Sequence, residues 1–207
     1  MNTLQSDTSK SQSRDSQSRR RVLWLAAFFF LPLALSFLLY YGNFWRPQGT
    51  TNKGNLITPA RPLSEVALTL ADGTQSASDV LRGKWTWIYI GDGQCDARCR
   101  AALTDIRQAR LLLVEKMDRV QRAFLVTGKC CDTEYLHSEH PGLIVARFDK
   151  PEFMASFALD ATDKPELAGR IYLIDPLGNL MMSYEPDAPS MGLLEDIKKL
   201  LKLSHIG

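Results

Sequence analysis

The sequence lacks several features that mark common classes of protein. Its 207 residues contain no internal repeat and no cysteine and histidine spacing typical of a zinc finger. Histidine is scarce, and none lies between His140 and His205. The formal net charge is +2, and residues 1–21 alone carry +3, so the rest of the chain is close to −1. Without a basic surface, the sequence indicates no nucleic-acid partner.

Charged residues are also absent from one long apolar segment, residues 22–41. A helix of about twenty residues spans about 30 Å, which is enough to cross the hydrocarbon core of a membrane. Three arginines, Arg19 to Arg21, precede the segment, so the positive-inside rule places the N-terminus in the cytoplasm. No small-residue cleavage site follows, which favours an anchor over a cleaved signal peptide. We expect a transmembrane anchor at 22–42 in a bacterial inner membrane, with the C-terminal domain in the periplasm.

The rest of the chain divides into three parts around this anchor. Residues 1–21 are rich in Ser, Gln and Arg and have little to bury, so we expect a disordered basic cytoplasmic tail. Residues 43–62 contain Gly and Pro without a regular apolar pattern, which is typical of a linker. Residues 63–207 hold the periodic segments and are expected to form one domain.

Within this domain the apolar pattern alternates between strands and helices. The expected strands are 66–70, 85–90, 123–127, 143–148, and a hairpin of 171–174 with 180–184. The expected helices run from Cys99 to about Arg119, over 151–159, and onward from Ser190. This order predicts an α/β protein of thioredoxin-like fold, in which helices flank a central mixed sheet.

Two cysteines follow the most apolar of the expected strands, 85–90. Cys95 and Cys99 come after Gly91 and Gly93, where the strand turns into a helix. Unpaired N–H groups at the start of a helix stabilise a thiolate. The spacing of four residues places both sulfurs on one face of the first turn, which suits a clamp on a soft metal ion or a reversible disulfide. A purely structural pair in the core is the alternative.

A second pair, Cys130 and Cys131, follows the next expected strand. Parallel neighbours end at the same edge of a sheet, so we expect all four sulfurs to lie near one another. Thiolates are preferred ligands of Cu(I), which makes Cys95 and Cys99 a candidate copper site, with Cys130 and Cys131 as further candidate ligands. A loop histidine, His137 or His140, is a further candidate ligand. An incidental place in the loop is the alternative for each of these residues.

Taken together, several of these features resemble the Sco family of membrane-anchored, thioredoxin-like proteins. The resemblance runs from about Pro62 to the last helix, and its motifs are Asp72-Gly73, Arg82-Gly83-Lys84-Trp85, the aromatic strand, Gly91 and Cys95-x-x-x-Cys99. It implies help in assembling a respiratory cytochrome c oxidase, by copper delivery or thiol maintenance through Cys95 and Cys99. The implied partners are oxidase subunits or other assembly factors.

The sequence also departs from the Sco pattern. Asp96 and Arg100 stand where the family has a proline after each cysteine. The family's third copper ligand, a histidine just before the first hairpin strand, aligns with Leu167. Three hypotheses therefore stand: an oxidase assembly factor that handles Cu(I) or maintains thiols, a thiol–disulfide oxidoreductase acting on periplasmic partners, and a non-catalytic docking scaffold. We favour the first, an assembly factor or metallochaperone rather than an enzyme.

Overall fold

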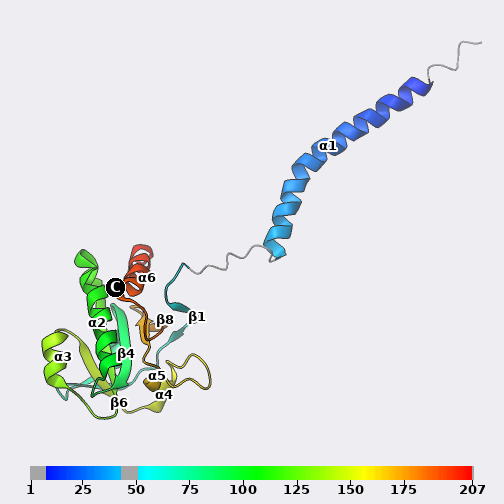
Figure 1. Ribbon diagram of the computed structural model, residues 1–207. Coiled ribbons are helices and arrows are strands. Elements are labelled where there is room, and N and C mark those ends of the chain that lie inside the picture. The colour runs from blue at the N-terminus through cyan, green and yellow to red at the C-terminus, as the bar shows by residue number, and fades with distance from the viewer. Residues whose placement is uncertain (1–7, 43–50, 207) are drawn as a thin grey trace, which may run out of the picture. The chain divides into compact units, whose positions relative to one another are not determined.

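The computed structural model describes residues 8–42 and 51–206, which belong to two units divided at Thr50. The first unit contains the helix α1, Thr8–Tyr41 (Figure 1). Its segment Arg19–Leu39 is long and apolar enough to cross a membrane, with a mean hydropathy of 2.5. The helix includes part of the tail that we expected to be disordered. Extending an existing helix is far easier than nucleating one, so the apolar segment carries helical structure into its polar neighbours.

The second unit is built on a mixed sheet, which within residues 51–206 has eight strands in the order β1-β8-β7-β4-β5-β6-β2-β3. The strands are β1 (Asn55–Pro62), β2 (Ala67–Leu70), β3 (Gln75–Ala77), β4 (Trp85–Asp92), β5 (Val120–Thr127), β6 (Ile144–Phe148), β7 (Ile171–Ile174) and β8 (Asn179–Tyr184). Strands β4, β5 and β6 are parallel, β7 pairs antiparallel with β4, and β8 pairs antiparallel with β7. The predicted thioredoxin-like arrangement is confirmed.

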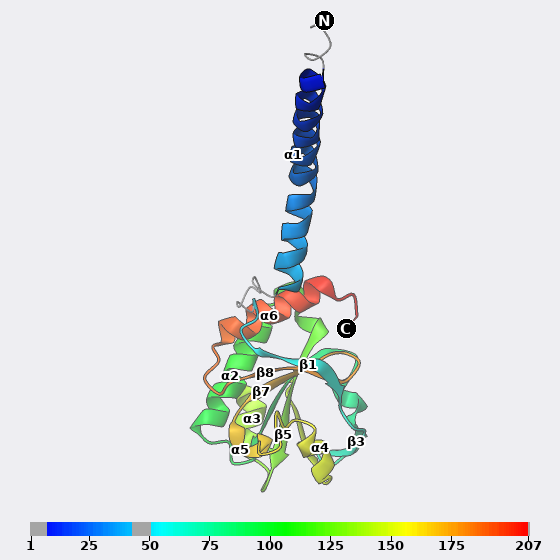
Figure 2. The ribbon, with the colours of Figure 1, turned by 90° about the vertical axis from the view of Figure 1, so that its right-hand side faces the viewer.

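Helices pack on both faces of the sheet (Figures 1 and 2). The α-helices of this unit are α2 (Ala97–Leu111), α3 (Thr133–Glu139), α4 (Pro151–Ala155), α5 (Pro165–Ala168) and α6 (Ser190–Leu203). Leu103 of α2, Leu136 of α3 and Leu193 of α6 share one buried cluster. Phe153 of α4 and Leu81 of the 3-10 helix Ser78–Leu81 belong to a second cluster. Each face of the sheet is therefore buried under its own apolar layer.

Side chains of the central strand β4 belong to both of these apolar layers. Trp87 and Tyr89 belong to the cluster with α2 and α6, whereas Ile88 and Ile90 belong to the other. Successive side chains of a strand point to opposite faces, so apolar residues at every position place the strand in the interior. This burial on both faces is the one expected from the composition of the strand.

Strand β1 corrects the expected linker. Residues 55–62, which we expected to belong to the linker 43–62, pair antiparallel with β8 at one edge of the sheet, whereas residues 43–50 of the expected linker lie outside the described residues. The backbone N–H groups of Lys53 and Gly54 donate hydrogen bonds of 2.8 and 2.9 Å to Oδ2 of the buried Asp196 in α6. The strand was not predicted because its sequence contains prolines, which only an edge strand tolerates.

Helix α2 is also shorter than expected. It ends at Leu111, and the 3-10 helix Val114–Arg119 follows in place of a continuous helix. Val114, the first residue of this 3-10 helix, has a φ of 48°, a left-handed conformation through which an α-helix does not continue and which is costly for a β-branched residue. Helices α3 and α5 were not expected from the sequence, because each is too short to show a periodic apolar pattern.

Candidate thiol–disulfide site

The two cysteine pairs follow neighbouring parallel strands at the same edge of the sheet. Asp92, the last residue of β4, is in register with Thr127, the last residue of β5. Cys95 and Cys130 each come three residues after the end of their strand. The register therefore brings the loops 93–96 and 128–132 to one edge, as the sequence predicted.

Cys95 and Cys99 form a disulfide between the end of β4 and the first turn of α2. Their exposed fractions are 1% and 2%, and both belong to the cluster beneath α2. Asp96 caps the helix, since its Oδ1 accepts a hydrogen bond of 2.9 Å from the Cys99 N–H. The bond thus lies where the N-terminus of a helix stabilises a thiolate released on reduction.

Cys130 and Cys131 form a second disulfide, between adjacent residues of the loop after β5. Cys130 is exposed, whereas Cys131 is half-buried and packs against the cluster that contains Cys95 and Cys99. All four cysteines lie within residues 51–206 and are paired in these two disulfides. Within the described part of the chain, no three His, Cys, Asp or Glu side chains are placed to hold a metal ion. The expected four-sulfur cluster is therefore not found there.

Backbone contacts join the two cysteine loops. The Asp132 N–H donates to the Gly93 carbonyl at 3.1 Å, and the Gly93 N–H donates to the Thr127 carbonyl at 3.3 Å. A Cβ at Gly93 would lie 2.8 Å from the Cys130 Cα and 2.9 Å from a methyl carbon of Val126. Only glycine allows this approach. Gly93, which precedes the cysteines in the sequence, therefore allows the two loops to pack closely.

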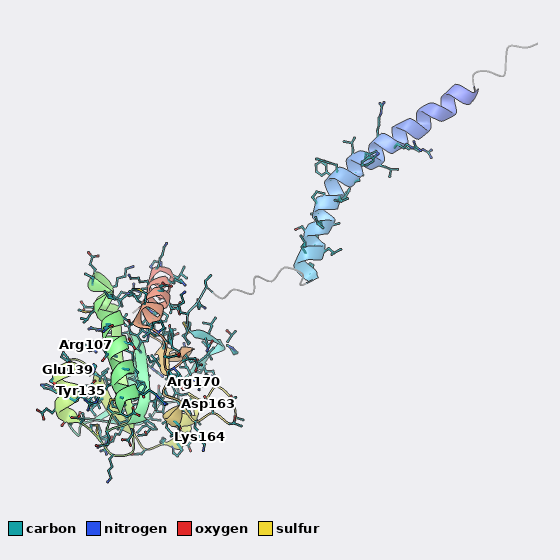
Figure 3. All side chains as sticks on the ribbon, viewed as in Figure 1. Arg107, Tyr135, Glu139, Asp163, Lys164 and Arg170 are labelled. Carbon is teal, nitrogen blue, oxygen red and sulfur yellow. A yellow bond between two sulfur atoms is a disulfide. The ribbon has the colours of Figure 1, made fainter. Side chains whose placement is uncertain are left out.

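Arg100 links the same loops through its side chain. Its Nε donates to the Cys95 carbonyl at 3.1 Å, and its Nη2 donates to Asp132 Oδ2 at 3.0 Å. The guanidinium also lies 4.1 Å from the centre of the Tyr135 ring, within the range of a cation–π contact. Figure 3 shows Tyr135 with Arg107 and Glu139 where α3 lies beside α2, and those two side chains form an ion pair of 3.6 Å. Sequence reasoning missed this link because its partners are about thirty residues apart.

The polar side chains around the Cys95–Cys99 bond include Tyr89 and Arg98. Burial raises the pKa of Tyr89, and the negative charge of Asp96 raises it further, whereas the positive charge of Arg98 opposes the shift. A Cβ at Gly169 would lie 2.7 Å from the Arg98 Cδ, so the stem of this arginine covers the backbone just before β7. The side chain of Arg98 therefore occupies the space beside the backbone just before β7.

That position is where the Sco resemblance places a third copper ligand. Leu167, which aligns with the histidine, is 69% exposed on α5. Arg170, the last residue before β7, donates hydrogen bonds of 2.8 Å to both carboxylate oxygens of Asp163 on the α5 side of the domain (Figure 3). The residues present do not fit the copper donor set that the resemblance implies, because residues 51–206 place no third His, Asp or Glu donor with the two sulfurs to hold a metal ion.

Comparison with known proteins agrees with the thioredoxin-like fold of the domain. Residues 85–204 match the model of the family described as "Transmembrane-like, thioredoxin-like, C-terminal domain". The chain belongs to this family. No curated protein matches the sequence of the chain.

Solved structures show the same thioredoxin-like fold at low sequence identity. ScoI of Arabidopsis thaliana, crystallised with copper bound, is 20% identical over 69% of this chain and 99% of its own, with a TM-score of 0.57. A putative protein disulfide isomerase from Bacteroides thetaiotaomicron is 18% identical over 73% of this chain and 95% of its own, with a TM-score of 0.54. BsSco, described as having a disulfide switch and as a member of the Sco family of cytochrome c oxidase assembly proteins, is 14% identical over 72% of this chain and 99% of its own, also at 0.54. The thioredoxin-like domain is therefore similar both to copper-binding and to thiol-active proteins.

Proposed function

We propose that this chain is a membrane-anchored factor that exchanges its Cys95–Cys99 disulfide with cysteines of a partner during assembly of a respiratory cytochrome c oxidase. The observation that carries the proposal is the placement of this disulfide at the junction of β4 and α2, with Asp96 capping the Cys99 N–H. Such a position favours reactive thiols, because the helix N-terminus stabilises a thiolate, both when the thiolate attacks a disulfide and when it is released from one.

The exchange follows the ordinary chemistry of thiols. A thiolate attacks one sulfur of the Cys95–Cys99 bond, forms a mixed disulfide, and displaces the other sulfur as a thiolate that takes up a proton. A second thiol of the attacking dithiol then displaces the first sulfur. Two electrons and two protons pass to Cys95 and Cys99, and the attacking dithiol becomes a disulfide. The reverse sequence would reduce a disulfide of the partner.

Copper handling has weaker support than thiol exchange. It is favoured by the similarity to Sco structures with copper bound and by two cysteines on one helical turn. It is opposed by the lack, within the described residues, of a third donor placed beside the two sulfurs. We therefore derive no copper-dependent step, and Cu(I) uptake by the reduced chain is tested separately.

The anchor and the orientation complete the proposal. The apolar segment Arg19–Leu39 would hold the chain in the inner membrane, and the three arginines at its start favour a cytoplasmic N-terminus. The domain would then face the periplasm, an oxidising compartment where disulfides persist. A reporter active only in the periplasm should work when fused to the C-terminus, whereas activity of a cytoplasmic reporter at the same point would reverse the orientation.

The function is tested on the full chain in detergent micelles. Redox buffers of glutathione should convert Cys95–Cys99 reversibly between disulfide and dithiol, as counted by mass spectrometry after alkylation, while the circular dichroism of the domain persists. The reduced chain should also reduce insulin disulfides, and Cys95→Ser with Cys99→Ser should remove one of its two dithiol equivalents. A bond that opens only when the domain unfolds would make the disulfide structural and refute the proposal.

A further inference from the structure

Access to the Cys95–Cys99 bond poses a problem for exchange with a macromolecule. With exposed fractions of 1% and 2%, neither sulfur is open to a thiol on another protein. The rate of thiol–disulfide exchange depends on approach along the S–S axis, so a buried bond reacts slowly with a large partner. The buried pair therefore needs a more accessible pair of thiols beside it.

The Cys130–Cys131 pair has that accessibility. Cys130 is exposed on the loop after β5 and borders a hollow of about 240 Å³ together with Arg147. Cys131 lines a neighbouring cavity of about 590 Å³, whose walls include Leu136, Leu143 and Ile144. An apolar wall beside a reactive bond can hold the apolar residues that flank a partner's cysteine, and a nearby positive charge favours the thiolate form.

The same loop is in contact with the loop of the buried pair. The Gly93 carbonyl accepts a hydrogen bond from Asp132, one residue after Cys131, and a Cβ on Gly93 would lie within 2.8 Å of the Cys130 Cα. Arg100 spans from the Cys95 carbonyl to Asp132. Cys131 also packs against the cluster of which the buried disulfide is part. The two cysteine loops are therefore in direct contact.

We propose that Cys130 and Cys131 form a relay through which partner thiols exchange with the buried Cys95–Cys99 pair. This inference rests on the proposed function and names the route by which it operates. It assigns a redox role to a cysteine pair that lies outside the Cys-x-x-x-Cys motif.

The relay has two balanced stages. A partner thiolate attacks Cys130, the Cys131 thiolate leaves and is protonated, and the partner's second thiol resolves the mixed disulfide. Cys130 and Cys131 are then thiols, and the partner is oxidised. The Cys131 thiolate next attacks Cys95 and displaces the Cys99 thiolate. Cys130 then attacks Cys131, which restores the outer bond and leaves Cys95 and Cys99 as thiols. The second stage needs no further oxidant or reductant.

A kinetic experiment on the full chain separates this route from direct attack. Reduced thioredoxin serves as a protein-sized dithiol, a small phosphine reductant serves as the control, and reduction of Cys95–Cys99 is followed by alkylation and mass spectrometry. In the variant Cys130→Ser with Cys131→Ser, reduction by thioredoxin should slow by about tenfold or more, because its thiols reach only the outer pair. Reduction by the phosphine should change less than about twofold, since this reagent needs no relay.

The remaining outcomes are also decisive. An unchanged rate with thioredoxin would overturn the relay and leave the exchange function standing. Equal slowing with both reductants would also overturn it, because the substitutions would then act through the structure of the loop. If neither reductant opens Cys95–Cys99 in the folded wild-type chain, the exchange function itself fails.

Trapping the intermediate gives an independent test. Cys99→Ser with Cys130→Ser leaves Cys95 and Cys131, and Cys99→Ser with Cys131→Ser leaves Cys95 and Cys130. At least one variant should form its remaining pair as an intramolecular disulfide on mild oxidation, at a yield that does not depend on protein concentration. If both variants form only dimers or keep free thiols, the loops cannot meet and the relay is refuted.

Discussion

The two cysteine pairs lie at the ends of neighbouring parallel strands, yet the protein holds them in opposite ways. Cys95–Cys99 lies in the apolar cluster beneath α2, at the helix start that Asp96 caps. Cys130–Cys131 lies in a loop, with Cys130 open to solvent. One bond is thus part of the core, and the other is attached to its edge. The difference indicates that the inner pair stabilises the domain, whereas the outer pair is free to react.

Removal of each disulfide should give the largest contrast between the pairs. Cys95→Ser with Cys99→Ser removes a cross-link worth about 2 kcal/mol for so short a loop, and each buried hydroxyl without a partner costs about 1–3 kcal/mol more. Cys130→Ser with Cys131→Ser should cost less than about 1 kcal/mol, because at least one new hydroxyl is exposed to water. Denaturant unfolding followed by circular dichroism measures both losses, and equal losses would contradict the contrast.

Cu(I) uptake tests whether the two pairs ever act as one metal site. We expect the reduced chain to lose Cu(I) to a chelator of moderate affinity, since the absence of a third donor should lower affinity by more than about 100-fold. Cys130→Ser with Cys131→Ser should leave this weak binding unchanged. Retention of one Cu(I) per chain, lost on substitution of either pair, would instead support a shared sulfur site.

The coupling between the loops should depend on Arg100. Arg100→Met keeps most of the side-chain length but removes the hydrogen bonds to the Cys95 carbonyl and Asp132 and the contact with Tyr135. We expect a loss of about 1 kcal/mol in unfolding free energy, because the ion pair is partly exposed and only modestly stabilising. Relay from the outer to the inner pair should slow as well. Arg107→Met is the matched control, since it removes the α2–α3 ion pair with Glu139 but touches neither cysteine loop.

The smallest expected effect concerns pH and the helix that follows the outer pair. His140, 2% exposed at the end of α3, has its pKa lowered by burial and then by the charges of Arg122 and Arg107, which Glu139 partly opposes. Its Nε2 lies 3.0 Å from the Tyr135 hydroxyl. In the unfolded chain the His140 imidazole takes up a proton near pH 6.5, whereas in the folded domain it does so only at a lower pH. The free energy of unfolding therefore falls as the pH drops below about 6.5.

The measurement for this prediction is the midpoint of thermal unfolding between pH 7.5 and 5. In His140→Gln the part of the pH dependence of the midpoint that this residue causes should vanish. A slope that survives in His140→Gln would assign the pH dependence to other groups.

Local pattern was sufficient for much of the architecture. The apolar strand at 85–90, the glycine-bearing turn and the cysteines that follow it predicted β4 and the position of Cys95 and Cys99. The hairpin of β7 and β8 was predicted as well, because two short apolar runs flank a clear turn. Parallel strands share an edge, so the meeting of the two cysteine loops also followed from the order of elements.

What the sequence could not determine depends on partners far away in the chain. Strand β1 forms because β8 provides an edge to pair with and because Asp196 binds the two residues just before the strand. The link from Arg100 to Asp132 and Tyr135 has no signature, because a side chain's neighbours are fixed only when the sheet assembles. The packing of the Arg98 side chain against Gly169 likewise cannot be predicted from the local sequence.

The sequence by itself determined that two thiol pairs follow two parallel strands, because the periodicity of strands and helices is a local property. Only the tertiary structure decided that one pair is enclosed and the other open, and that their loops touch at Gly93. Burial depends on how α2, α3 and the sheet pack together, and that packing is set by contacts between residues distant in the chain.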